Sequence, residues 1–157
     1  AVLTSMMFFQ SVTMQESSME PTLAVGNRYF INKLAYKTSS PKRGDIIVFR
    51  TNASDDAALH IRRVIGLPGE TIQIVDGKIL INGEIYKEGK DFPTINNPGM
   101  AATAVTLEAG EYFVLGDNRN NSEDSRYGDI GRVNKKYTTG KLWFQISPMK
   151  DAGLLND

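Results

Sequence analysis

The sequence contains no cysteine and a single histidine, His60. Disulfides and thiolate metal sites are therefore excluded, and so is a metal site built on several histidines. We expect no metal and no cofactor. The chain also has no net charge, because 18 basic residues balance 18 acidic ones. This balance gives no reason to expect nucleic acid as a partner.

Long hydrophobic runs are absent too. No stretch reaches the roughly 18 apolar residues that a membrane-spanning helix needs. The first ten residues are nevertheless apolar, with Val2, Leu3, Met6, Met7, Phe8 and Phe9. Two interpretations stay open and are compatible: an ordinary first β-strand, or the remnant of a membrane anchor that has been removed from the chain.

The chain is rich in short β-forming runs separated by turn residues. They predict strands at 8–15, 28–32, 45–50, 59–65, 71–75, 78–81, 84–86, 105–107, 112–115 and 141–146. The run at 45–50 is almost continuously apolar, which indicates a strand covered on both faces. Asp76-Gly77 is a strong type I′ hairpin signal, and Asn82-Gly83 offers a second tight turn. With no long amphipathic helix, we predict a mostly β fold.

The most informative stretch is Ser17-Ser18-Met19-Glu20-Pro21-Thr22-Leu23. A serine hydroxyl is a poor nucleophile until a neighbouring base takes its proton. A sharp turn before a proline would expose the Ser18 hydroxyl, and the backbone N–H of the same residue could help to bind an oxyanion. A lone serine before a turn is common, so Ser18 by itself does not indicate a catalytic site.

Four segments, in the same order, resemble type I signal peptidases, which are serine peptidases with a Ser–Lys dyad. They are Ser-Met-x-Pro-Thr-Leu at 18–23, Arg-Gly-Asp-Ile-Ile-Val-Phe at 43–49, the run at 62–72, and Gly-Asp-Asn-Arg to Tyr-Gly at 116–128. The resemblance implies a β core at 1–69 and 111–157 with a small β-cap inserted at 70–110. It also implies a single-pass membrane anchor before the domain, which would lie on the extracytoplasmic side. The short cap suits the Gram-positive-type enzymes.

The resemblance also implies roles for individual residues. Ser18 would be the nucleophile, with Met19 and Pro21 shaping its turn. The Ser122 hydroxyl would bond the base, while Asp124 and Arg126 would hold their loop by charge pairing. Arg63 and Asp117 would be structural supports.

Two positions depart from the family pattern. Arg62 stands where the family has its lysine base. A guanidinium keeps its proton above about pH 12 and has no acceptor, so it cannot act as a general base. Losing general-base action costs on the order of 10²–10⁴-fold in rate.

The second departure is Glu16, where the family has a small residue or serine beside the oxyanion hole. Residues two apart on an extended strand share a face, so its carboxylate should lie near Ser18. We hypothesise that Glu16 and Arg62 form an ion pair across the cleft. The alternative is that the two side chains point elsewhere, and a separation above about 6 Å, beyond ion-pair reach, would exclude the pair.

His60 could in principle replace the missing base, because eukaryotic and archaeal relatives carry histidine at the base position. His60 lies two residues before Arg62 and shares its strand face. It should sit about 6.5 Å further along the strand, too far from Ser18 without a register shift. The ordinary interpretation is a polar residue lining the cleft.

Two functions from different classes remain. The first is a signal peptidase that cuts after small residues in secreted precursors, with an engineered change at Arg62 that traps it. The second is a non-catalytic relative that binds extended signal peptides or pilin-type precursors by strand addition. Such relatives are associated with pilus assembly on Gram-positive surfaces. Glu16 favours the second, because a trapping mutation at residue 62 would not explain it.

Overall fold

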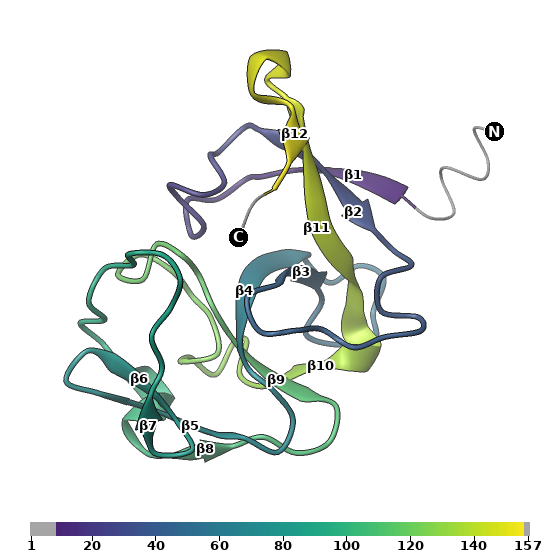
Figure 1. Cartoon of the computed structure of the whole chain (residues 1–157). Coiled ribbons are helices and arrows are strands. Elements are labelled where there is room, and N and C mark those ends of the chain that lie inside the picture. Colours follow the sequence, from purple (N-terminus) through teal and green to yellow (C-terminus); the bar gives the residue numbers. More distant parts are fainter. Residues whose placement is uncertain (1–8, 156–157) are drawn as a thin grey trace.

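The computed structural model describes residues 9–155, which form short strands and three 3₁₀ turns (Figure 1). The strands are β1 (Phe9–Thr13), β2 (Arg28–Asn32), β3 (Ile46–Phe49), β4 (His60–Gly66), β5 (Thr71–Val75), β6 (Lys78–Ile81), β7 (Glu84–Ile85), β8 (Val105–Thr106), β9 (Glu111–Leu115), β10 (Val133–Asn134), β11 (Thr138–Ser147) and β12 (Gly153–Leu154). The 3₁₀ turns span Gly99–Ala102, Lys135–Tyr137 and Met149–Asp151. The predicted mostly β fold is confirmed.

The larger sheet has the order β1-β2-β11-β3-β4-β9-β10, with β12 pairing β11, and it curls on itself (Figure 1). All its pairs are antiparallel. β11 is the longest strand and connects β2 to β3, with register shifts along both pairings. β1 pairs with β2 alone among the described strands, so its other edge is open.

The smaller sheet has the order β7-β6-β5-β8 and lies within the segment predicted as the cap. Both predicted turns are present in it. Asp76 and Gly77 have φ of 52° and 75°, and Asn82 and Gly83 have φ of 52° and 84°. Positive φ at both central residues is what a type I′ turn requires. The domain boundaries themselves stay a prediction.

Strand β3 is buried along its whole length, as the apolar run at 45–50 predicts. Ile46 and Val48 pack into one hydrophobic cluster, while Ile47 and Phe49 pack into another on the opposite face. A third cluster joins the smaller sheet to β4 and β9, and includes Ile65, Ile72, Ile74, Ile79, Phe113 and Leu115. The cap is therefore packed directly on the strands that carry Arg62 and its neighbours.

The sequence missed β10 and β12, which have two residues each, too short for a period-2 pattern. It also missed the 3₁₀ turn at Gly99–Ala102, inside a segment rich in proline and asparagine. The apolar segment 2–8 lies outside the described residues. Between residues 9 and 155, no helix has both the length and the apolar character needed to cross a bilayer.

Candidate active site

Ser18 lies on the turn that follows β1, where the chain leaves the larger sheet. The turn is closed by backbone hydrogen bonds from Glu20 to Ser17 and from Leu23 to Met19, at 3.1 and 2.9 Å. Ser18 is almost buried in the protein, yet it lines a cavity of about 610 Å³. The turn thus presents the hydroxyl to a pocket, where Ser18 is less exposed than the sequence predicts.

The segment 116–128 fastens this turn from the other side. The Asn118 backbone N–H donates to the Ser18 carbonyl at 2.9 Å, and its side chain donates to the Ser17 carbonyl at 3.0 Å. A Cβ at Gly116 would lie 2.0 Å from the Ser122 Oγ and 2.6 Å from the Ser18 carbonyl oxygen. Only glycine allows the two segments to approach this closely.

Arg63 and Asp117 form a buried support beneath the turn. The guanidinium donates two hydrogen bonds of 2.8 Å to the two Asp117 oxygens. Asp117 also accepts a hydrogen bond of 2.6 Å from the Thr22 hydroxyl, and its N–H donates to the Met19 sulfur at 3.4 Å. Three of the predicted supports therefore meet at one point, while Pro21 lies in the turn above them and is exposed.

Asp124 and Arg126 are joined by a pair of 2.8 Å hydrogen bonds, and both are buried. The charge pairing expected from the sequence is present. Ser122 differs from expectation. Its hydroxyl donates to Asp124 at 3.1 Å, and within the described part of the chain it forms no hydrogen bond with Arg62. A guanidinium offers no lone pair to a hydroxyl donor, so the carboxylate takes this hydrogen bond instead.

Arg119 was not singled out from the sequence, although it ties this loop to the cap. Its Nε donates to the Gly116 carbonyl at 2.9 Å, and its two terminal nitrogens donate to the Glu88 carboxylate at 2.8 and 2.6 Å. The guanidinium also lies 4.1 Å from the centre of the Phe92 ring. No spacing signal could have revealed these contacts, because Glu88 is 31 residues away in sequence.

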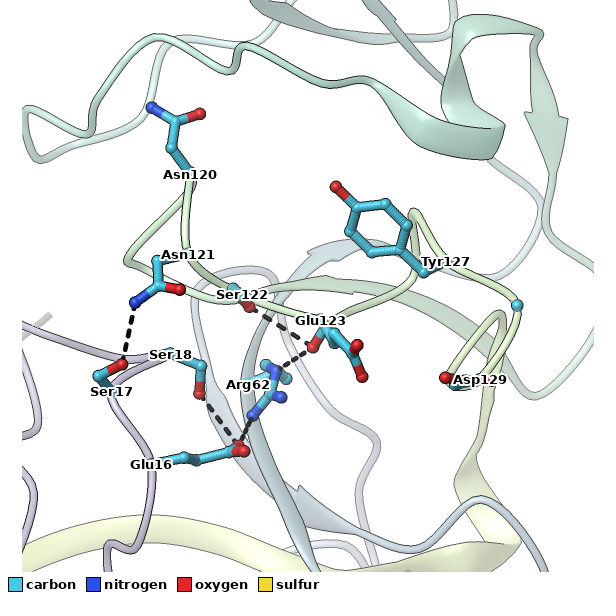
Figure 2. Close-up of a pocket in the computed structure, with 11 residues that line it drawn as sticks. Glu16, Ser17, Ser18, Arg62, Asn120, Asn121, Ser122, Glu123, Tyr127 and Asp129 are labelled. Atoms are coloured by element: carbon cyan, nitrogen blue, oxygen red, sulfur yellow. Dashed lines mark hydrogen bonds and ion pairs between the residues drawn. The ribbon is translucent and has the colours of Figure 1, made fainter.

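Arg62 projects from β4 and is 2% exposed, so its charge needs a partner. Its Nε donates to the Glu123 carbonyl at 2.7 Å. Its Nη1 donates to the Ile61 carbonyl at 2.7 Å and to the Glu16 Oε1 at 2.6 Å (Figure 2). The hypothesised ion pair between Glu16 and Arg62 is present, well inside the 6 Å limit set from the sequence.

The Ser18 hydroxyl donates to the same Glu16 oxygen, at 3.1 Å (Figure 2). Ser18 and Arg62 therefore meet at Glu16 Oε1, with no hydrogen bond between them. The sequence placed Glu16 near the site but did not predict this contact. The available signal was the two-residue spacing on one extended segment.

Burial raises the pKa of Glu16, but the charge and hydrogen bond of Arg62 and the hydrogen bond from Ser18 outweigh it, so the net pKa is lowered. Burial and the Arg62 charge lower the pKa of His60, against the opposing charges of Glu16 and Glu123. At neutral pH, Glu16 is thus an anion and His60 is neutral.

His60 does not reach Ser18 by a hydrogen bond in the described structure. Its ring lies 5.7 Å from that of Phe49, and it lines a groove of about 700 Å³ that runs beside β1. His60 thus lines this groove and is not among the residues that line the cavity at Ser18. Glu16 lines both this groove and the cavity at Ser18. Across residues 9–155, no three histidine or acidic side chains converge as metal ligands.

A serine on a strand-end turn supported by buried ion pairs is how a serine hydrolase holds its nucleophile, although the buried cation Arg62 cannot act as its base. The family model described as "Signal peptidase, peptidase S26" matches residues 1–146. The chain therefore belongs to the signal peptidase family.

Individual relatives agree with this assignment. A probable signal peptidase I-2 from Synechocystis sp. is 37% identical over 145 residues, covering 90% of this chain and 64% of the relative. Signal peptidase I T from Bacillus subtilis is 35% identical over 158 residues, covering 96% and 80%. The crystal structure of a signal peptidase I from Enterococcus faecalis V583 superposes with a TM-score of 0.53 at 33% identity, covering 66% of this chain and 97% of that one. The chain spans 64% of the length of the Synechocystis relative.

Proposed function

We propose that this chain binds signal peptides of exported precursors beside Ser18 and cleaves them slowly or not at all. Family membership supports the substrate class. One observation supports slow or absent cleavage. Glu16 Oε1 accepts hydrogen bonds from both Ser18, at 3.1 Å, and Arg62, at 2.6 Å.

The impairment has two physical causes. Arg62 stands at the base position and cannot accept the serine proton. The Glu16 carboxylate that accepts the Ser18 hydroxyl has a lowered pKa, so it is a weak base and a poor replacement for the missing amine. Losing the base alone accounts for about 10²–10⁴-fold in rate.

The open edge of β1 supports peptide binding. The groove beside it is lined by residues 10–16 on one side, and by Arg50 and residues 57–61 on the other. An extended peptide could add to this edge as a further strand through backbone hydrogen bonds. Because precursors of this kind emerge from the membrane, we place the domain on the extracytoplasmic side of the cell membrane, next to a single-pass anchor.

The second candidate is a purely non-catalytic role, in which the groove holds extended peptides such as pilin-type precursors during the assembly of pili or other surface proteins. The pairing of Glu16 with Arg62 favours it, because the ion pair occupies the catalytic position while the groove beside β1 stays open.

Binding and cleavage of one fluorescent signal peptide would test the proposal. We expect saturable binding by fluorescence anisotropy, no binding of a scrambled peptide, and an intact peptide after prolonged incubation. Any residual cleavage should disappear in Ser18→Ala. Cleavage at a rate typical of the family would refute the impaired step, and equal affinity for the scrambled peptide would refute the binding role.

A further inference from the structure

We propose that Glu16 is a proton acceptor for Ser18, and that this pair supports slow acyl transfer from small esters with good leaving groups. This activity goes beyond signal-peptide binding, since it needs no peptide in the groove beside β1. It also differs from lysine-dependent catalysis, because the acceptor belongs to the same segment as the nucleophile.

The geometry meets the first requirement of a general base. The Ser18 hydroxyl donates to Glu16 Oε1 at 3.1 Å, within the range of about 2.6–3.2 Å needed for proton abstraction. Both residues line the 610 Å³ cavity (Figure 2), so a small ester has room to approach Ser18 Oγ. The Glu16 side chain is 49% exposed, which lets the serine proton leave to water before the acyl-serine is hydrolysed.

Donors for the developing oxyanion lie at the same place. Within residues 9–155, Arg62 Nη2 and the Ser18 backbone N–H form no hydrogen bond to the protein. Arg62 lines the cavity, and its fixed positive charge offsets the negative charge of Glu16. The guanidinium, useless as a base, is thus suited to stabilising an oxyanion.

With an aryl acetate, the reaction balances as follows. Ser18 Oγ attacks the ester carbon, its proton passes to Glu16 Oε1, and a bond forms between Oγ and the acetyl carbon. The bond between that carbon and the aryl oxygen then breaks, and the aryloxide leaves as an anion. Glu16 then loses the serine proton to water. In the second stage, water attacks the acetyl carbon and one of its protons passes to the Glu16 carboxylate. The bond between that carbon and Ser18 Oγ breaks, Oγ takes this proton back from Glu16, and acetic acid leaves and ionises to acetate in water.

The leaving group limits this chemistry. An aryloxide departs without a proton, whereas the amine of a peptide bond must be protonated as it leaves. Glu16 has a lowered pKa, so it is a weak base, and efficiency falls as the pKa of a base falls below the working pH. Reactive esters are therefore within its reach, and peptide bonds are poor substrates.

The test uses 4-nitrophenyl acetate with the whole chain. Release of 4-nitrophenolate gives the acylation rate, and mass spectrometry of the fragment containing Ser18 shows whether one acetyl group sits on that residue. Glu16→Gln keeps the size and the acceptor oxygen but removes the basic charge. We expect it to acylate at least about tenfold more slowly, toward the 10²–10⁴-fold that general-base action supplies. The matched control is Glu84→Gln, the same change at an exposed carboxylate in β7. This variant should acylate at the wild-type rate.

Thermal unfolding of Glu16→Gln shows whether the variant is folded, and Glu16→Asp gives a second comparison that keeps the charge but shortens the side chain. Glu16→Asp should also acylate slowly. Equal acylation of Ser18 in wild type and in Glu16→Gln would overturn the proposal, as would the absence of acetyl-Ser18 in wild type. Neither result depends on signal-peptide binding, so failure here is distinguishable from failure of the peptide-binding role.

The pH profile separates the possible bases. Glu16 faces Arg62 and His60 from β4 and Ser18 from its own turn, and Glu123 acts on His60 from the opposite loop. Acylation should rise as the Glu16 carboxyl deprotonates in the acid range and then stay flat above about pH 6. A rise of Ser18 acylation with pH that persists in Glu16→Gln would assign the base to another group, such as His60, and would overturn the proposal.

Discussion

Replacing Arg62 by lysine is expected to restore little peptide cleavage unless Glu16 is replaced as well. A lysine base works only while its amine is neutral, which burial favours by lowering the lysine pKa. In this chain the cation at position 62 is held at 2.6 Å from a carboxylate. A lysine there would form the same ion pair, and the pair would keep the ammonium protonated.

The size of this effect follows from the distance and the exposure of Glu16. Two unit charges about 4 Å apart interact by about 1 kcal/mol in bulk water and about 4 kcal/mol near a protein surface. Because the Glu16 side chain is 49% exposed, its interaction energy with a cation at position 62 should fall between these limits. At about 1.4 kcal/mol per pKa unit, the carboxylate raises the lysine pKa by about 0.7 to three units. The neutral fraction, and with it the rate, would fall by about 5-fold to 10³-fold.

The assay is cleavage of one signal peptide at a single mildly alkaline pH by three proteins: wild type, Arg62→Lys, and Arg62→Lys combined with Glu16→Ser. We expect the double variant to cleave the peptide about 5-fold to 10³-fold faster than Arg62→Lys alone. Adding Ser18→Ala to the double variant should abolish cleavage. Equal rates for the single and double variants would refute the electrostatic argument. A double variant as inactive as wild type would show that these two positions do not account for the lost activity.

Two further predictions concern stability. Asp117→Asn should lower the free energy of unfolding by about 3–5 kcal/mol in urea titrations, because it removes the buried carboxylate charge that pairs with Arg63; a loss below about 1 kcal/mol would contradict this. The hydrogen bonds from Arg43 hold the pKa of Glu70 below its usual value, against the opposing effect of burial. The stability that Glu70 gains from this pairing is fully present above its pKa in the unfolded chain, about 4.3. It is lost as the pH falls through the lower pKa of Glu70 in the folded chain. In Glu70→Gln the free energy of unfolding should therefore decline less as the pH falls below about 4.3. The same decline as in wild type would contradict this role of Glu70.

The sequence predicted the parts of this molecule that depend on local chemistry. Asp76-Gly77 specified its turn because both positions require positive φ, and the apolar run at 45–50 specified a strand covered on both faces. The roles of Arg63, Asp117 and Asp124 stay expectations drawn from the family, although the structure places their ion pairs as a support would need them.

What the sequence did not predict depends on non-local contacts. Ser122 donates to Asp124, and among the described residues it forms no hydrogen bond with Arg62, whose Nε and Nη1 donate to the carbonyl oxygens of Glu123 and Ile61 and to Glu16. The ion pair between Arg119 and Glu88 depends on how the cap packs against the segment 116–128. Two-residue strands such as β10 are formed by pairing across the sheet and leave no periodic pattern in the chain.

Glu16 and Arg62 constrain each other, because each supplies the countercharge of the other. Arg62 is almost completely buried, and a buried guanidinium without a partner is strongly unfavourable. Carbonyl oxygens of Ile61 and Glu123 satisfy some of its donors but not its charge. The carboxylate at position 16 supplies the missing countercharge from the strand end that carries Ser18. Replacing Glu16 alone by serine would therefore leave a buried cation without its countercharge. Replacing Arg62 alone by lysine would leave a carboxylate that keeps the lysine protonated.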